Sequence, residues 1–133
     1  MVIDYNLSSA AHCETGQEEI VYIGQIIQTK EGGMLVLRNG LRLSPEPSQK
    51  LVNHSPNGFS WGYSGSGPAQ LALGLLLDVT HDPSLARDHH QCFKAAIIAG
   101  LDKDRSWTLT STAILTWLAE DKLLHEAANV RHD

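Results

Sequence analysis

The pattern of apolar and polar positions divides the chain into a strand-like first half and a helical second half. β-branched residues dominate residues 20–28, which predicts one strand there. Two short apolar runs, 34–38 and 41–43, flank Asn39-Gly40. This pair favours a tight hairpin, because both central residues of a type I′ turn need positive φ. The pattern therefore predicts a three-stranded antiparallel meander.

The second half has the periodicity of helices. A proline near its start and apolar residues on nearly all sides predict a buried central helix over residues 68–79. An Asp-Pro pair predicts the start of a second helix over 82–100, and a third is expected over about 110–128. Residues 107–109 fit either a short strand or an extended lead-in to that helix.

Length and composition fit one small folded domain. The chain has 133 residues, with 42% hydrophobic and 19% charged residues, as in ordinary globular proteins. Residues 1–18 show no sustained period, so we expect an extended arm there. The fold expected for 19–133 is a single α+β domain, a three-stranded antiparallel meander packed on about three helices.

The net charge and the cysteine content indicate which classes of partner and which cellular compartment to expect. With 10 Lys+Arg against 15 Asp+Glu, the net charge is −5. This argues against non-specific nucleic-acid binding, which depends on basic residues that neutralise phosphates. No apolar run approaches the roughly 20 residues of a membrane span, and the N-terminus has no signal-peptide pattern. With Cys13 and Cys92 interpreted as reduced thiols, we expect a cytoplasmic protein with no membrane partner.

The most informative segment is the uncharged segment, residues 51–77, which has no Asp, Glu, Lys or Arg. At this chain's own 19% of charged residues, a segment of this length would hold about five. Its first part is rich in glycine, serine and asparagine and is therefore not simply hydrophobic. Two interpretations stay open: a loop buried inside the protein, or the lining of a cleft.

Three aromatic residues in this segment, Phe59, Trp61 and Tyr63, alternate with glycine or serine. In an extended conformation, a period of two places all three rings on one face. Such a face can stack on a nucleobase, and Trp61 and Tyr63 are the rings that we expect to do so. The alternative is that the rings belong to the core.

Polar and glycine residues around the rings complete the expected binding site. His54 offers a polar contact, and Gln70 either braces the loop or contacts a ligand. The first N–H groups of the central helix, at residues 69–71, favour an anion, unless Ser66 simply caps this helix. The candidate ligand-binding residues are Asn53, His54, Trp61, Tyr63, Ser64, Gly65, Ser66, Gly67 and Gln70.

Catalytic and metal motifs receive less support. Residues 58–62 match the Gly-x-Ser-x-Gly nucleophile pattern around Ser60, but lack its strand–turn–helix context. A loose group of potential metal ligands lies near the second helix, where we expect His89 and Cys92 to face inward and His90 to point elsewhere. The other members of this group are His81 and Asp82. We therefore expect no metal and no cofactor.

Several segments together resemble one family. They are Tyr22-Ile23-Gly24, Asn-His-Ser-Pro-Asn-Gly-Phe-Ser-Trp-Gly-Tyr (53–63), 65–73 and, later, 93–94 and 107–117. Over about residues 20–118 the chain resembles small proteins of unknown function from bacteria, phages and other mobile elements. The resemblance implies no established activity and no catalytic residue. It implies a mobile-element setting, in which small acidic proteins often inhibit host defence systems or sequester ligands.

Three functional hypotheses follow. The first is a non-catalytic protein that binds a small polar or nucleotide-like ligand through residues 53–70. The second is a protein-interaction module, either an inhibitor of a host defence protein or a homodimer, that uses the same aromatic surface. The third and weakest is a small hydrolase centred on Ser60 or His54.

Overall fold

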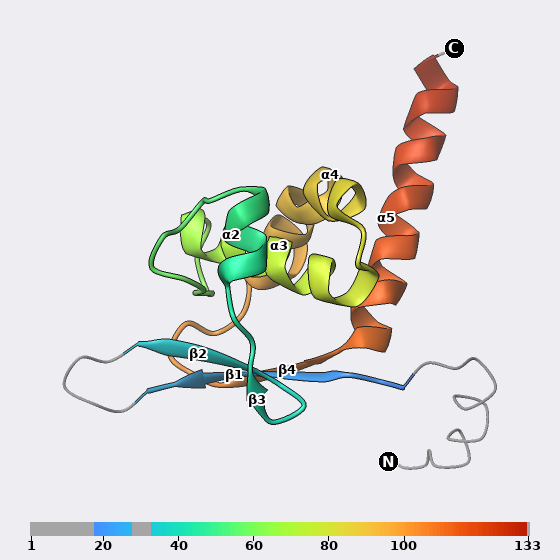
Figure 1. The fold of residues 1–133 in the computed structure, drawn as a ribbon. Coiled ribbons are helices and arrows are strands. Elements are labelled where there is room, and N and C mark those ends of the chain that lie inside the picture. The colour runs from blue at the N-terminus through green and yellow to red at the C-terminus, as the bar shows by residue number, and fades with distance from the viewer. Residues whose placement is uncertain (1–17, 28–32, 133) are drawn as a thin grey trace.

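The computed structural model describes residues 18–27 and 33–132, without the side chains of 128–132. A four-stranded antiparallel sheet forms one layer, and the helices pack on one of its faces (Figure 1). This is the α+β class that the sequence predicts. The expected arm, residues 1–18, lies outside the described residues except for its last position.

The sheet contains one strand more than predicted. The predicted meander consists of β1 (Val21–Ile26), β2 (Met34–Arg38) and β3 (Leu41–Arg42). At the turn between β2 and β3, φ is 50° for Asn39 and 88° for Gly40, which confirms the positive values expected there. The fourth strand, β4 (Trp107–Thr110), pairs with the free edge of β1 and gives the order β3-β2-β1-β4. Of the two alternatives for residues 107–109, a short strand or an extended lead-in, the structure therefore has the strand.

The three predicted helices are present, with one short helix in addition. They are α3 (Ser66–Thr80), α4 (Pro83–Phe93), which continues into the π-helix η1 (Lys94–Ile98), and α5 (Ser111–His132). The Asp82 side chain caps α4 by accepting a hydrogen bond from the Leu85 N–H at 3.1 Å.

The additional helix is α2 (Glu46–Leu51), which follows β3. The prolines in this region fit its start, because the first N–H groups of a helix have no intrahelical partner.

The core lies between the sheet and α3, as the apolar character of α3 predicts. The fully buried leucines of α3 pack with residues from the sheet, α4, η1 and α5. Tyr22, Phe93, Ile98 and Ile114 are fully buried partners of these leucines. Burial in this core explains why residues 67–76 carry no charge, since an ionised side chain there would lose its hydration without a partner.

A polar network joins the edge of this core to the sheet. The Tyr22 hydroxyl donates a hydrogen bond to Asp78 on α3, and Arg38 Nε donates to the same carboxylate oxygen at 2.7 Å. Burial, together with the bond to Asp78, raises the pKa of Tyr22, so the phenol stays protonated. The network therefore fixes β1 and β2 against the C-terminal end of α3.

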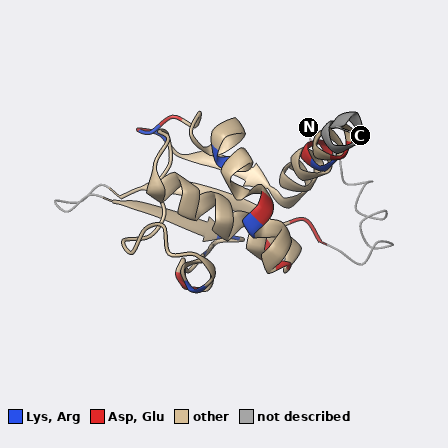
Figure 2. Ribbon diagram, turned by 90° about the horizontal axis from the view of Figure 1, so that it is seen from above, with Lys and Arg blue, Asp and Glu red and all other residues tan. Residues whose placement is uncertain are grey.

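Charged residues lie mostly on the outer helices and loops. In the described part of the chain, Lys and Arg stand beside Asp and Glu instead of gathering on one face (Figure 2). Among the described residues, no helix combines the length and apolar character that a membrane crossing requires. The C-terminal half of α5 extends beyond the body of the molecule (Figure 1).

Candidate functional site

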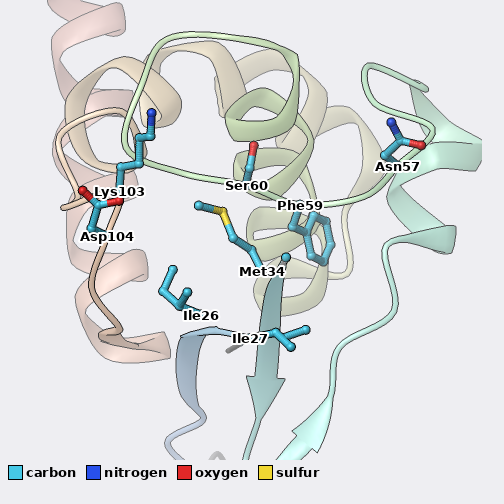
Figure 3. Close-up of a pocket in the computed structure, with 9 residues that line it drawn as sticks. Ile26, Ile27, Met34, Asn57, Phe59, Ser60, Lys103 and Asp104 are labelled. Carbon is cyan, nitrogen blue, oxygen red and sulfur yellow. The ribbon is translucent and has the colours of Figure 1, made fainter. Parts of the chain in front are cut away.

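A cavity of about 510 Å³ lies where the uncharged segment meets the ends of β1 and β2 (Figure 3). Three parts of the chain form its walls: the ends of the first two strands, the uncharged segment and the loop before β4. The lining residues are Ile26, Ile27, Gly33, Met34, Asn57, Phe59, Ser60, Lys103 and Asp104. We call this the strand-end cavity.

Backbone contacts hold the walls of the strand-end cavity in place. The Ile27 N–H donates to the Gly33 carbonyl at 2.9 Å and keeps the ends of β1 and β2 together. The Gly62 N–H donates to the Ile98 carbonyl at 3.1 Å. Gly62 has a φ of 87°, and a Cβ there would lie 2.5 Å from Lys103 Cβ. Glycine at this position therefore lets the uncharged segment contact the loop before β4.

The cavity combines an apolar interior with a polar rim. Ile26, Ile27, Met34 and Phe59 provide apolar surface. Lys103 and Asp104 lie on one side of Met34 and Asn57 on the other (Figure 3). Such a combination suits a small ligand that has an apolar or flat body and a polar or charged end.

Trp61 does not contribute to this cavity, which corrects one prediction. Its side chain is 0% exposed and packs edge-to-face against Trp107, with ring centroids 5.5 Å apart. Neither indole N–H has a hydrogen-bond partner in the described part of the chain. The positive φ of Gly62 interrupts the extended conformation that a period of two assumes. Trp61 is consequently a core residue, whereas Tyr63 is 47% exposed.

Gln70 is fully buried, and both ends of its amide are used within the protein. Its Oε1 accepts hydrogen bonds from the backbone N–H groups of His54 at 2.7 Å and Ser55 at 2.9 Å. Its Nε2 donates to Ser48 Oγ at 2.9 Å and to the Val52 carbonyl at 3.0 Å. These bonds use the two donors and two acceptor positions of the amide. Of the two predicted roles, Gln70 therefore has that of a brace for the loop.

His54 forms a pair with His90 of α4. Their Nε2 atoms lie 2.9 Å apart, and His90 Nδ1 lies 2.7 Å from the Arg87 carbonyl oxygen. Because a carbonyl only accepts, His90 Nδ1 carries a proton. In the neutral pair, His90 Nε2 accepts and His54 Nε2 donates. Desolvation lowers the pKa of His54, and electrostatic interactions with His90 and Lys94 act in the same direction.

The expected orientation of two side chains of α4 is wrong. His90 is buried, although we expected it to point away from the interior, and Cys92 is exposed, although we expected it to face inward. The inward face of α4 consists of Ala86, His89, His90 and Phe93. The apolar residues 85 and 93 alone do not determine to within one residue which side of α4 faces the core. A rotation of the helix by about one residue is enough to bury His90 and expose Cys92.

The first turn of α3 does not offer the predicted N–H groups. The helix begins at Ser66, before Pro68, and the Ala69 N–H already donates to the Gly65 carbonyl at 3.0 Å. No side chain caps this end, so Ser66 is not the cap either. A Cβ on Gly65 would lie 2.5 Å from Tyr63 Cε2, which shows how closely the tyrosine ring covers the helix start.

The remaining candidates lie around this helix start. Asn53, Ser64 and Ser66 are exposed, while Gly67 is buried against the Ser60 side chain. None of the nine predicted ligand residues lines the strand-end cavity. Three neighbours in the same segment, Asn57, Phe59 and Ser60, do.

The nucleophile pattern around Ser60 lacks a histidine base in the described structure. Ser60 Oγ lies 2.9 Å from the Tyr63 hydroxyl, and His54 is hydrogen-bonded to His90 instead. A serine nucleophile needs a base that takes its proton. The geometry around Ser60 therefore favours hydrogen bonding over hydrolysis.

The chain was compared with known protein families, curated proteins and solved structures. A model of a family of unknown function, DUF6166, matches residues 22–120. The chain belongs to this family. The range matched by DUF6166 contains every residue of the strand-end cavity and ends before the middle of α5. No curated protein and no solved structure matches the chain.

Proposed function

We propose that this DUF6166 protein is a non-catalytic binding protein that takes a small polar or nucleotide-like ligand in the strand-end cavity. The observation that carries the proposal is the cavity itself, about 510 Å³ with apolar walls and a few polar groups at its rim. Ligand pockets commonly have volumes of about 300–1,000 Å³ and this kind of lining. The uncharged segment still contributes to the proposed site, as the sequence predicts. Its aromatic residue in the cavity is Phe59, whereas the sequence analysis expects Trp61 and Tyr63.

The lining residues differ in the kind of ligand group that each can contact. Phe59 and Met34 offer apolar surface to a flat group such as a base. The Lys103 ammonium suits an anionic group, and Asp104 accepts hydrogen bonds from hydroxyl or amino groups. Asn57 and Ser60 supply neutral donors and acceptors. The shortage of charge along the segment wall favours a ligand of low charge.

We further propose that binding serves sequestration in the cytoplasm. The resemblance to proteins of phages and other mobile elements supports this setting. Among the described residues, those that line the cavity include no histidine or cysteine, the side chains that most readily take or give protons near neutral pH.

A thermal-shift screen against nucleotides and polar metabolites tests the proposal. A compound at 100 times its Kd should stabilise the protein by about 2.7 kcal/mol and raise its Tm. Lys103→Ala should weaken binding of an anionic compound at least about tenfold, the effect of losing one charged contact. Lys50→Ala, an exposed lysine on α2, is the matched control and should leave the Kd unchanged. Equal Kd values for wild type and Lys103→Ala would place the ligand elsewhere.

The competing proposal is a protein-interaction module or homodimer. With Trp61 buried, the predicted aromatic surface is reduced to Tyr63 as its exposed ring. A stable dimer in light scattering that Tyr63→Ala converts to a monomer would favour this alternative over ligand binding. A monomer whose Tm rises with a compound from the screen would favour the binding protein.

A further inference from the structure

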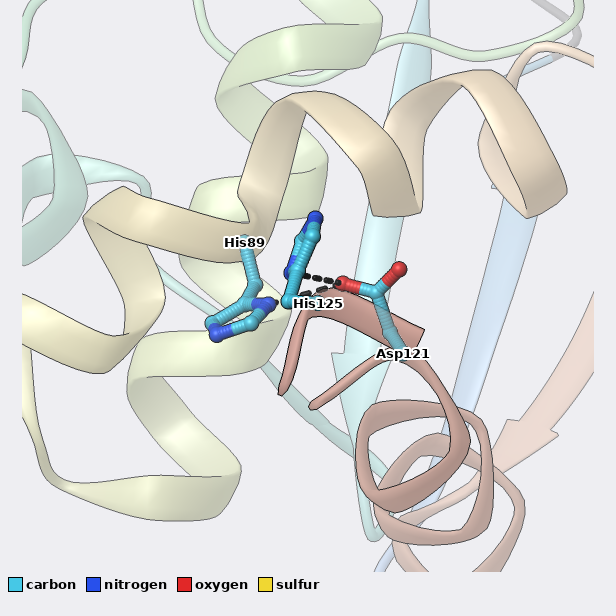
Figure 4. Close-up of side chains that lie close together, drawn as sticks. All are labelled: His89, Asp121 and His125. Atoms are coloured by element: carbon cyan, nitrogen blue, oxygen red, sulfur yellow. Dashed lines mark hydrogen bonds and ion pairs between the residues drawn. The ribbon is translucent and has the colours of Figure 1, made fainter. Parts of the chain in front are cut away.

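A second group of side chains lies far from the uncharged segment in sequence, where α4 meets α5. His89 comes from α4, and Asp121 and His125 come from α5 (Figure 4). The spacing of four residues on α5 places Asp121 and His125 on the same side of that helix. One nitrogen or oxygen atom from each of the three side chains lies within 4.8 Å of the others.

The contacts within this group are close. His89 Nδ1 lies 2.7 Å from Asp121 Oδ2, and His125 Nδ1 lies 3.6 Å from the same oxygen. The two imidazole rings stand side by side, with centroids 5.2 Å apart. The side chains of His89 and Asp121 are only 11% and 13% exposed, whereas that of His125 is 50% exposed. The group is thus sheltered on one side and open to solvent on the other.

We propose that His89, Asp121 and His125 bind a divalent transition-metal ion, for which Zn²⁺ is the best match. Two imidazoles and one carboxylate are a common ligand set for Zn²⁺, which binds them at about 2.0–2.2 Å. In a tetrahedral site of that size the ligand atoms lie about 3.3–3.5 Å apart. The distances between the present ligand atoms lie on both sides of this value, so the three side chains would rotate to bind one ion, and the hydrogen bond between His89 and Asp121 would open.

The surroundings also favour a cation. A hollow of about 290 Å³ lies beside the group and is lined by Asp88, His89, Lys122, His125 and Glu126. Two carboxylates and one ammonium surround its opening, in addition to the Asp121 carboxylate. The hollow gives an ion a path to the ligands and leaves space for water in the fourth coordination position.

Metal binding at this place has a consequence for α5. The second half of this helix extends past the body, and exposed Leu123 and Leu124 contribute little to its packing (Figure 1). A metal ion shared between α4 and α5 would hold the middle of α5 against the body.

The test uses the full chain, stripped of metal with a chelator and then titrated with Zn²⁺ and with Co²⁺. We expect one ion per chain, a rise in Tm with Zn²⁺, and the intense visible absorption of tetrahedral Co²⁺. Asp121→Asn and His125→Gln should each weaken Zn²⁺ binding on the order of 100-fold or more, since even indirect partners of a metal cost about 10–100-fold. His125 is half exposed, so His125→Gln gives a result even if Asp121→Asn does not fold.

The matched control is His81→Asn, an exposed histidine at the end of α3 whose positive φ asparagine tolerates. It should bind Zn²⁺ as the wild type does. The proposal is overturned if the wild type takes up no ion, or if His125→Gln binds as tightly as the wild type. It is equally overturned if His81→Asn loses as much affinity as His125→Gln. None of these outcomes depends on a ligand in the strand-end cavity.

Discussion

At the scale of single residues, the uncharged segment is organised by side chains that bond to its own backbone. Gln70 holds the N–H groups of residues 54 and 55, while Trp61 fills space against Trp107. Two causes account for part of the absence of charge: burial of residues 67–76 and a cavity wall at Asn57, Phe59 and Ser60. A buried amide with all of its bonds made is sensitive to substitution, because each lost partner leaves a polar group without compensation.

Gln70→Ala should lower the free energy of unfolding by about 2–3 kcal/mol, the cost of leaving buried donors and acceptors without partners. Urea denaturation followed by circular dichroism measures this change. Gln91→Ala is the control, because Gln91 is exposed on α4 and its loss should change stability by less than about 0.5 kcal/mol. Equal stability of Gln70→Ala and Gln91→Ala would show that the amide does not brace the loop.

The His54–His90 pair predicts a dependence of stability on pH. The pKa of His54 is lowered from 6.5 in the folded protein, so the unfolded chain takes up a proton more readily. Stability should therefore be full above about pH 6.5 and should fall as the pH decreases from there towards the lowered pKa. His90 and Lys94 are the neighbouring groups whose electrostatic interactions also lower the pKa of His54.

Urea denaturation at several pH values between about 7.5 and 5 measures this effect, since histidines titrate in that range. His54→Gln should reduce the loss of stability on acidification. An NMR titration that places the pKa of His54 at or above 6.5 would contradict the explanation.

At the scale of elements, the features that local chemistry determines were predictable. Asn39-Gly40 specifies its own turn, and the apolar length of α3 identifies it as the central helix. β4 has only 4 residues, and its status as a strand depends on pairing with β1, which lies far away in sequence. The short α2 was missed because its prolines were interpreted only as the end of the meander.

The contact between β1 and β4 also explains a glycine in the middle of a strand. Gly24 pairs with Trp107, and a Cβ at Gly24 would overlap the Trp107 indole. Gly24→Ala should cost about 1–3 kcal/mol of stability, as overpacking usually does. Gln25→Ala, at the exposed next position of β1, is the control for the denaturation measurement and should have a smaller effect. A Gly24→Ala protein as stable as Gln25→Ala would refute this explanation of the glycine.

At the scale of the whole molecule, two candidate sites lie on different sets of elements. The strand-end cavity forms between the sheet and two loops, whereas the His89, Asp121 and His125 group joins α4 and α5. The sequence could identify one wall of the cavity, because the uncharged segment is continuous. The opposite walls, at Met34 and Lys103, come from distant parts of the chain that only the tertiary fold brings together. The same reason applies to His89, which is 32 positions from Asp121.

The most direct measurement of ligand binding in the cavity uses its methionine. The chain has 2 methionines, Met1 and Met34, and Met34 lines the cavity. In NMR spectra of protein labelled at the methionine methyl groups, a compound that raises the Tm should shift the Met34 resonance in a saturable way. Met34→Leu assigns the two signals. Compounds that stabilise the protein while the Met34 resonance stays in place would contradict binding in the cavity.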